Sequence, residues 1–164
     1  IAFITSKGTL DKENPNVRKY IAQRADLLGA IRLPNDTFKA AAGTEVTSDI
    51  IFLQKRDRLV DIEPDWVHLA TDANGIRMNA YFVDNPEMVL GDMQMVSGPH
   101  GMESACIAYE NAELGDLLRD AIQNLHDEIT AFEIDDLEEE VEDLSIPTDP
   151  ELRNFNLPVV DSNI

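Results

Sequence analysis

The chain has 164 residues, of which 43% are hydrophobic, and a formal net charge of −19. This length and composition are typical of a globular fold with a sizeable core. No run approaches the 18 apolar residues of a membrane span and no secretory signal opens the chain, so we expect a cytoplasmic protein without a membrane partner. Cys106 is the single cysteine and cannot form an internal disulfide; its residue type predicts a small buried side chain.

The negative charge is unevenly distributed. Residues 1–59 contain 10 Lys and Arg against 7 Asp and Glu, residues 60–126 contain 2 against 12, and residues 127–164 contain 1 against 13. Contact with phosphate depends on local positive charge. The first third can therefore face a nucleic acid backbone, whereas the other two thirds cannot.

The chain begins with an apolar run, and its first predicted element is a strand over Ile1–Thr5. Because the run has neither an initiating Met nor a turn before it, we expect the chain to be part of a longer protein. Asn14 and Pro15 then form a helix start, and the predicted helix extends from Pro15 to Leu27. Its apolar face includes Val17 and Tyr20, with Arg18 on another face.

Two strands are expected next, over Leu28–Leu33 and Thr47–Gln54, joined by a polar loop. The second strand contains the consecutive apolar residues IIFL, which is typical of a strand covered on both faces. The order strand, helix, strand, loop, strand is that of the end of an α/β sheet. We take residues 1–59 as the first structural part.

Residues 60–126 predict a small α+β extension. Aromatic and apolar residues among turn formers over 61–91 indicate short helical turns that pack onto a core. MQMV and SACIAY are expected as strands on either side of the turn SGPHG, and apolar spacing over 111–126 predicts a helix capped by Asn111. Residues 127–164 predict an acidic amphipathic helix followed by a proline-containing linker.

The sequence contains no residue spacing that is typical of a catalytic or metal-binding site. His68, His100 and His126 are far apart and outside any metal-ligand spacing. Phosphate-binding glycine patterns are missing. Ser6 lies beside Lys7 without a second base, so the two are better explained as polar residues at the surface than as a nucleophile and its base. The sequence also lacks a nucleophile, a base and an orienting group at the spacing that a stand-alone hydrolase needs. We predict no catalytic, metal-binding or cofactor-binding residue in this chain.

The loop from Pro34 to Thr44 is the best candidate for a binding site, since α/β proteins usually bind ligands at loops that follow strands. Two interpretations of Phe38 are open. The ring can anchor an ordinary crossover by packing beneath it. Alternatively, it can lie at the rim of the sheet and offer a flat face to a planar ligand such as a base, where stacking contributes roughly 1 to 3 kcal/mol.

Three segments carry a resemblance to a known family: IAFITSKGTLDK, VRKYIAQRADLLGAIRLPNDTFKA and GTEVTSDIIFLQKR. Over residues 1–58 the chain resembles the second half of the catalytic domain of bacterial adenine-N6 DNA methyltransferases. It is closest to the form within very large methylase-helicase proteins of mobile elements, and is also similar to the modification subunits of type I restriction systems. NAYFVDNPEMVLG resembles the segment that follows the methylase in the same large proteins.

The resemblance implies a fold and a function. The fold would be α/β, a partial mixed sheet from the C-terminal half of a Rossmann-like domain, with its last strand antiparallel to the neighbouring strands. The family's Asn/Asp-Pro-Pro-Tyr/Phe motif and its glycine loop for S-adenosylmethionine do not occur in this chain. The parent protein would methylate adenine in DNA with that donor, whereas this fragment would bind no cofactor and be inactive alone.

By the same resemblance, this chain would contribute the side of the site that holds the target base. The base is reached by extrusion, because a stacked, paired adenine cannot meet the methyl donor. The implied substrate-binding residues are Phe38, Asn35, Gly43 and Thr44. On such a methylase surface, the positively charged Lys39, Lys55 and Arg56 are the residues expected to contact the DNA backbone.

A second hypothesis assigns no catalytic role. Residues 60–164 would form an acidic protein-interaction module that docks onto a basic partner or onto the helicase portion of the same polypeptide. A sheet cut from a larger one also exposes an edge, so we expect self-association through that edge.

Overall fold

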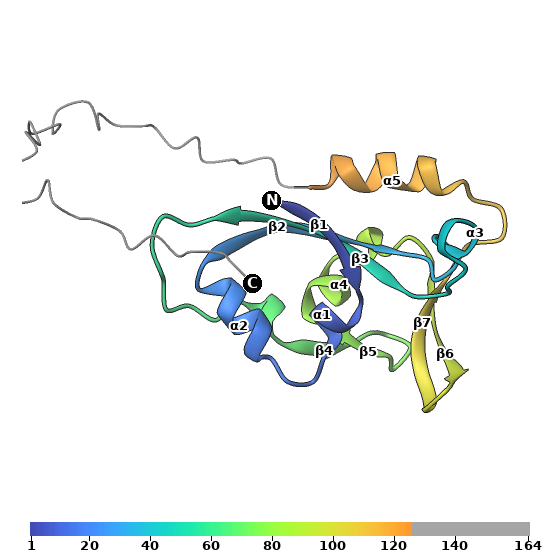
Figure 1. Ribbon diagram of the computed structural model, residues 1–164, viewed down its shortest axis with the longest axis horizontal. Coiled ribbons are helices and arrows are strands. Elements are labelled where there is room, and N and C mark those ends of the chain that lie inside the picture. The colour runs from blue at the N-terminus through green and yellow to red at the C-terminus, as the bar shows by residue number, and fades with distance from the viewer. Residues whose placement is uncertain (126–164) are drawn as a thin grey trace, which may run out of the picture. The chain divides into compact units, whose positions relative to one another are not determined.

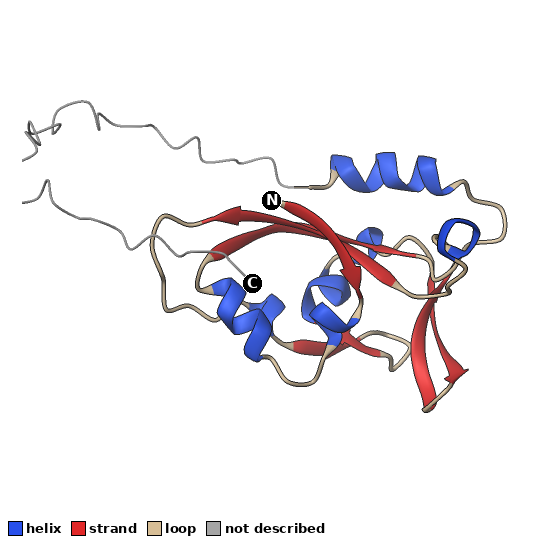
Figure 2. Cartoon of the chain, in the orientation of Figure 1, coloured by secondary structure: helices blue, strands red, loops and turns tan. Residues whose placement is uncertain are grey.

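A computed structural model describes residues 1–125 of the chain, and the predicted acidic helix and linker lie outside the described residues. The described part is mixed α/β, with small antiparallel sheets and short helices (Figures 1 and 2). None of its helices is long and apolar enough to cross a membrane.

The main sheet is built from the three predicted apolar runs. Its strands are β1 (Ala2–Ser6), β2 (Ala25–Leu33) and β3 (Ser48–Lys55). β3 lies between the other two and is antiparallel to both, with Ile50 opposite Ile4 on one side and Ile31 on the other. This confirms that the last strand of the unit runs antiparallel to its neighbours. β1 and β2 therefore point in the same direction.

The predicted helix over residues 15–27 was wrong at its C-terminal end. α2 spans Asn16–Ala22, and β2 already begins at Ala25. Residues 25–27 pair with the end of β3 in antiparallel register, so sheet hydrogen bonds replace the last helical turn. Ala25 and Leu28 continue the helical spacing, whereas Ala25 and Leu27 alternate as in a strand, so the apolar spacing did not distinguish the two structures.

The predicted apolar face of this helix was also wrong. Val17 and Tyr20 are exposed, whereas Arg18 is fully buried. The Arg18 guanidinium donates to the carbonyl oxygens of Val67 at 2.6 Å and Lys12 at 2.7 Å. Burial of an arginine is stable when its donors are satisfied in this way. Arg18 thus attaches α2 to the extension.

The extension begins with the short helical turns that the sequence predicted. They are η1 (Asp65–Val67), α4 (Ala80–Asp84) and η2 (Pro86–Met88). Between them lies a small hairpin of β4 (Leu69–Thr71) and β5 (Arg77–Asn79), which was not predicted. Its strands have three residues each, too few for a recognisable alternation.

The predicted hairpin and final helix are present. β6 (Asp92–Gly98) and β7 (Gly101–Ile107) pair across the expected turn. α5 spans Leu114–Gln123, so Asn111 does not cap it, and its N-cap residue Glu113 makes no side-chain cap bond. Two one-turn helices, α1 (Gly8–Asp11) and α3 (Lys39–Ala42), complete the described elements.

One hydrophobic core joins the first part to the extension. Figure 1 shows α5 on one side of the main sheet and α1 and α4 on the other. At the open edge of the sheet, Ile1 and Ile4 are exposed, as expected of an unpaired edge strand. The fully buried centre of the core is drawn from both parts: Leu10, Ala30, Ile31, Ile51, Met78, Phe82, Met88, Cys106 and Ala121.

Candidate functional site

The loop between β2 and β3 lies where two strands end. The antiparallel register places Ser48 at the start of β3 opposite Ser6 on one side and Leu33 on the other. The carboxyl ends of β1 and β2 therefore meet at the loop. In α/β proteins this edge of the sheet is the usual place for a ligand.

Both stems of the loop are fixed by hydrogen bonds. The Asn35 N–H donates to the Cys106 carbonyl oxygen at 2.7 Å, and the Cys106 N–H donates to the Thr47 hydroxyl at 2.9 Å. The Val46 N–H closes the loop by donating to the Asn35 carbonyl oxygen at 2.8 Å. A rigid base in β7 thus supports an exposed tip over residues 39–45.

Phe38 is half-buried and packs against the core directly before α3. Part of the ring therefore anchors the loop while part remains accessible. A pocket of about 260 Å³ lies at the same end of the sheet, and Phe38 does not line it. Its lining residues include Pro34, Asp36 and Thr37 from the loop and Leu114 and Leu117 from α5.

The other predicted residues of the loop have identifiable local roles. Gly43 has a left-handed φ of 65°, and its N–H donates to the Lys39 carbonyl oxygen, so this glycine ends α3. Thr44 is exposed. The Lys39 ammonium lies 2.5 Å from a carboxylate oxygen of Glu45, and that hydrogen bond raises the pKa of Lys39. Glu45 therefore partly neutralises this predicted phosphate contact.

Lys55 and Arg56 do not join Phe38 in one surface. They lie at the opposite end of β3 from the loop, roughly 23 Å away by the rise of a seven-residue step. Arg56 donates two bonds to the Asp26 carboxylate and one to the Ala22 carbonyl oxygen. The hydrogen bond from Arg56 lowers the pKa of Asp26. Arg56 thus connects the end of β3 to the start of β2.

A buried charged network lies beneath the loop, and sequence reasoning missed it. The Arg32 guanidinium donates to both carboxylate oxygens of Asp49, at 2.8 and 2.9 Å. A third nitrogen lies 2.8 Å from Asp11, without hydrogen-bond alignment. The ring of Phe82 packs on the guanidinium at 4.3 Å. The sequence contained a signal for this network, because each of the two apolar strands includes one charged residue: Arg32 in LGAIRL and Asp49 in DIIFL.

The network keeps its charges in spite of burial. Burial alone would lower the pKa of Arg32, but the carboxylates of Asp49 and Asp11 raise it above its ordinary value. Burial also raises the pKa of Asp49, an effect that the Arg32 guanidinium opposes. A bidentate arginine–carboxylate pair has the geometry that favours two ionised partners. The pair fixes β2 to β3 at the ends that carry the loop.

Among the described residues, neither the single cysteine nor a group of metal-binding side chains forms a reactive site. Cys106 is fully buried, as predicted, and burial raises the pKa of its thiol to about 12. A protonated, inaccessible thiol is a poor nucleophile. Among residues 1–125, no group of three His, Cys, Asp or Glu side chains has a metal-binding arrangement.

Comparison with known proteins adds no assignment to these observations. No protein-family model matches the chain, and neither the curated proteins nor the solved structures contain a match.

Proposed function

We propose that this chain is part of an S-adenosylmethionine-dependent DNA adenine-N6 methyltransferase and contributes the wall of the active site that faces the target base. The observation that carries the proposal is the arrangement of the main sheet. An antiparallel last strand lies between two strands of the same direction, as the family resemblance implies. The sheet would then be the C-terminal half of a Rossmann-like domain.

The geometry of the loop supports the same function. The exposed tip extends from the carboxyl ends of β1 and β2 and is held at its base by Asn35, Val46 and Thr47. A half-buried Phe38 can keep its position through the core and still offer an aromatic surface. Stacking of an extruded adenine needs a ring that is fixed and reachable at once.

The residues of this chain would position the base rather than react with it. Arg32 and Asp49 hold together the two strands from which the loop emerges, so the ring of Phe38 is placed by a rigid support. The preceding portion of the parent protein would bind the methyl donor and would provide the groups that contact the adenine amine. When bound, S-adenosylmethionine would supply the methyl group.

The proposal predicts that the isolated chain does not bind the donor. In a calorimetric titration with S-adenosylmethionine we expect no measurable heat of binding, because the family's glycine loop does not occur in the sequence. We also expect no methyl transfer to duplex DNA by this chain alone. Tight donor binding would mean that a complete cofactor site lies within these 164 residues, which contradicts the proposed division of the active site.

A further inference from the structure

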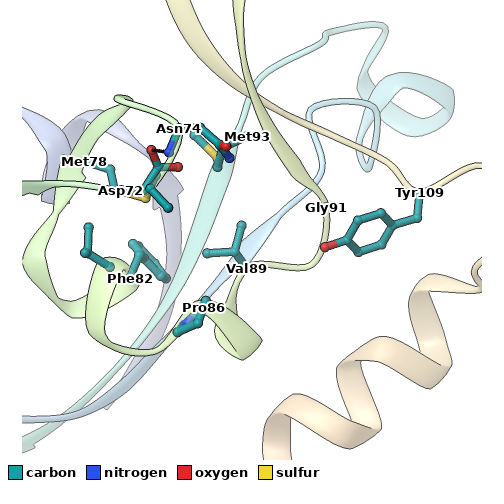
Figure 3. A pocket seen from close by; sticks show the side chains of 11 residues that line it. Asp72, Asn74, Met78, Phe82, Pro86, Val89, Gly91, Met93 and Tyr109 are labelled. Atoms are coloured by element: carbon teal, nitrogen blue, oxygen red, sulfur yellow. Dashed lines mark hydrogen bonds between the residues drawn. The ribbon is translucent and has the colours of Figure 1, made fainter.

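A second pocket, separate from the loop, lies in the extension. It has a volume of about 320 Å³ and opens between the β4–β5 turn, α4 and the start of β6 (Figure 3). Its deepest residues, Met78 and Phe82, are almost fully buried. Most of the other lining residues belong to NAYFVDNPEMVLG and to the residues just after it: Val83, Pro86, Val89, Gly91 and Met93.

Carboxylates lie beside this pocket. Asp72 lines it, and the exposed Asp84 and Glu87 directly follow the lining residues Val83 and Pro86. We call these three acids the acidic rim. None of them forms an ion pair with another described residue.

The cations of the extension do not neutralise the acidic rim. Its arginines, Arg77 and Arg119, are paired with Glu13 and Asp116 instead. Carboxylates beside a low-dielectric apolar cavity produce a strong local negative potential. Such a site attracts positive charge and repels phosphate.

The apolar surface continues from the pocket along the β6–β7 hairpin. Met95 follows the lining residue Met93 on the same face of β6, and the register places Met102, opposite Ser97, on that face too. Met95 is 49% exposed and Met102 is 65% exposed. Methionine side chains adapt their shape to a partner and are common on surfaces that bind peptides.

We propose that this pocket docks a basic segment of a partner protein, with one large apolar side chain in the cavity and Lys or Arg residues on either side of it. The cavity is at the lower end of the roughly 300 to 1,000 Å³ of ligand pockets, which suits a single anchor. The acidic rim selects for flanking cations and against nucleic acid. This inference does not depend on the methyltransferase function, because it uses none of the loop residues.

The test uses the full chain and a dye-labelled nine-residue peptide with a central Trp and four Lys on each side, followed by fluorescence anisotropy near physiological salt. Ala73 is exposed and lines the mouth, so Ala73→Trp blocks the cavity without altering the core. The double variant Asp84→Asn/Glu87→Gln removes two of the three charges of the acidic rim. We expect each change to weaken binding roughly tenfold or more.

Two controls separate docking from general attraction between a basic peptide and an acidic protein. Asp57→Asn/Asp61→Asn removes the same charge from exposed positions after β3, and should leave binding unchanged. A peptide with Ser in place of Trp should bind at least about tenfold more weakly than the Trp peptide. The proposal is overturned if both peptides bind equally, or if Ala73→Trp binds like the unmodified chain while circular dichroism shows it folded.

Discussion

Asp49→Ala lowers the free energy of unfolding by about 3 to 5 kcal/mol, the range observed when one partner of a buried ion pair is removed. Asp49 is fully buried and accepts two bonds from the equally buried Arg32. Without Asp49 the guanidinium keeps its charge but loses both bonds, and Asp11 reaches a single nitrogen without hydrogen-bond alignment. Urea denaturation followed by circular dichroism measures the loss.

Two further variants show whether charge is the cause. Replacing both partners, as Arg32→Met/Asp49→Leu, should recover much of the lost stability, because no unpaired charge remains buried. Glu63, an exposed carboxylate in contact with Lys19 and His68, is the matched control, and Glu63→Ala should change stability by less than about 1 kcal/mol. If Asp49→Ala is no more destabilising than Glu63→Ala, the buried pair does not hold the strands together.

Asn79→Ala is the second variant with a large expected effect. The fully buried Asn79 amide donates to the carbonyl oxygens of Leu10 at 2.9 Å and Trp66 at 2.8 Å, and its oxygen accepts from the Tyr81 N–H at 3.0 Å. Alanine leaves these backbone groups unpaired, and each buried unsatisfied group costs about 1 to 3 kcal/mol. We expect a loss of at least about 2 kcal/mol in urea denaturation.

The comparison for this variant is Asn111→Ala. Asn111 is exposed and does not cap α5, so its replacement should change stability by no more than about 0.5 kcal/mol. Equal stability of the two variants would mean that Asn79 does not join α1, η1 and α4.

Hydrophobic patterning was sufficient to predict most of the elements. The three apolar runs form the main sheet, and the β6–β7 hairpin and α5 lie close to their expected positions. Patterning failed where the same apolar residues fit both a helix and a strand, as at the junction of α2 and β2. It also failed for Arg18, whose burial depends in part on the carbonyl oxygen of Val67, 49 residues away in the sequence. Such partners have no local signature.

The candidate site was predictable to a smaller extent. The position of the loop followed from strand order, but the hydrogen bonds that join Cys106 to Asn35 and to Thr47 connect residues 71 and 59 positions apart in the sequence. Lys55 and Arg56 were predicted from their charge to contact DNA on the same surface as Phe38, but the length of β3 separates them from the loop. The pocket in the extension was not predicted, because its residues come from several short elements.

The proposed function is tested most directly by methyl transfer to DNA. The polypeptide used should contain this chain together with the segment that precedes it in the parent protein, and the product is N6-methyladenine formed from labelled S-adenosylmethionine. We expect activity in the unmodified protein, a reduction of about 5- to 150-fold for Phe38→Ala, and near-normal activity for Phe38→Tyr, which keeps the ring. Absence of N6-methyladenine from the unmodified protein, or equal rates for Phe38→Ala, would contradict the assignment of this chain to the target-base side of the site.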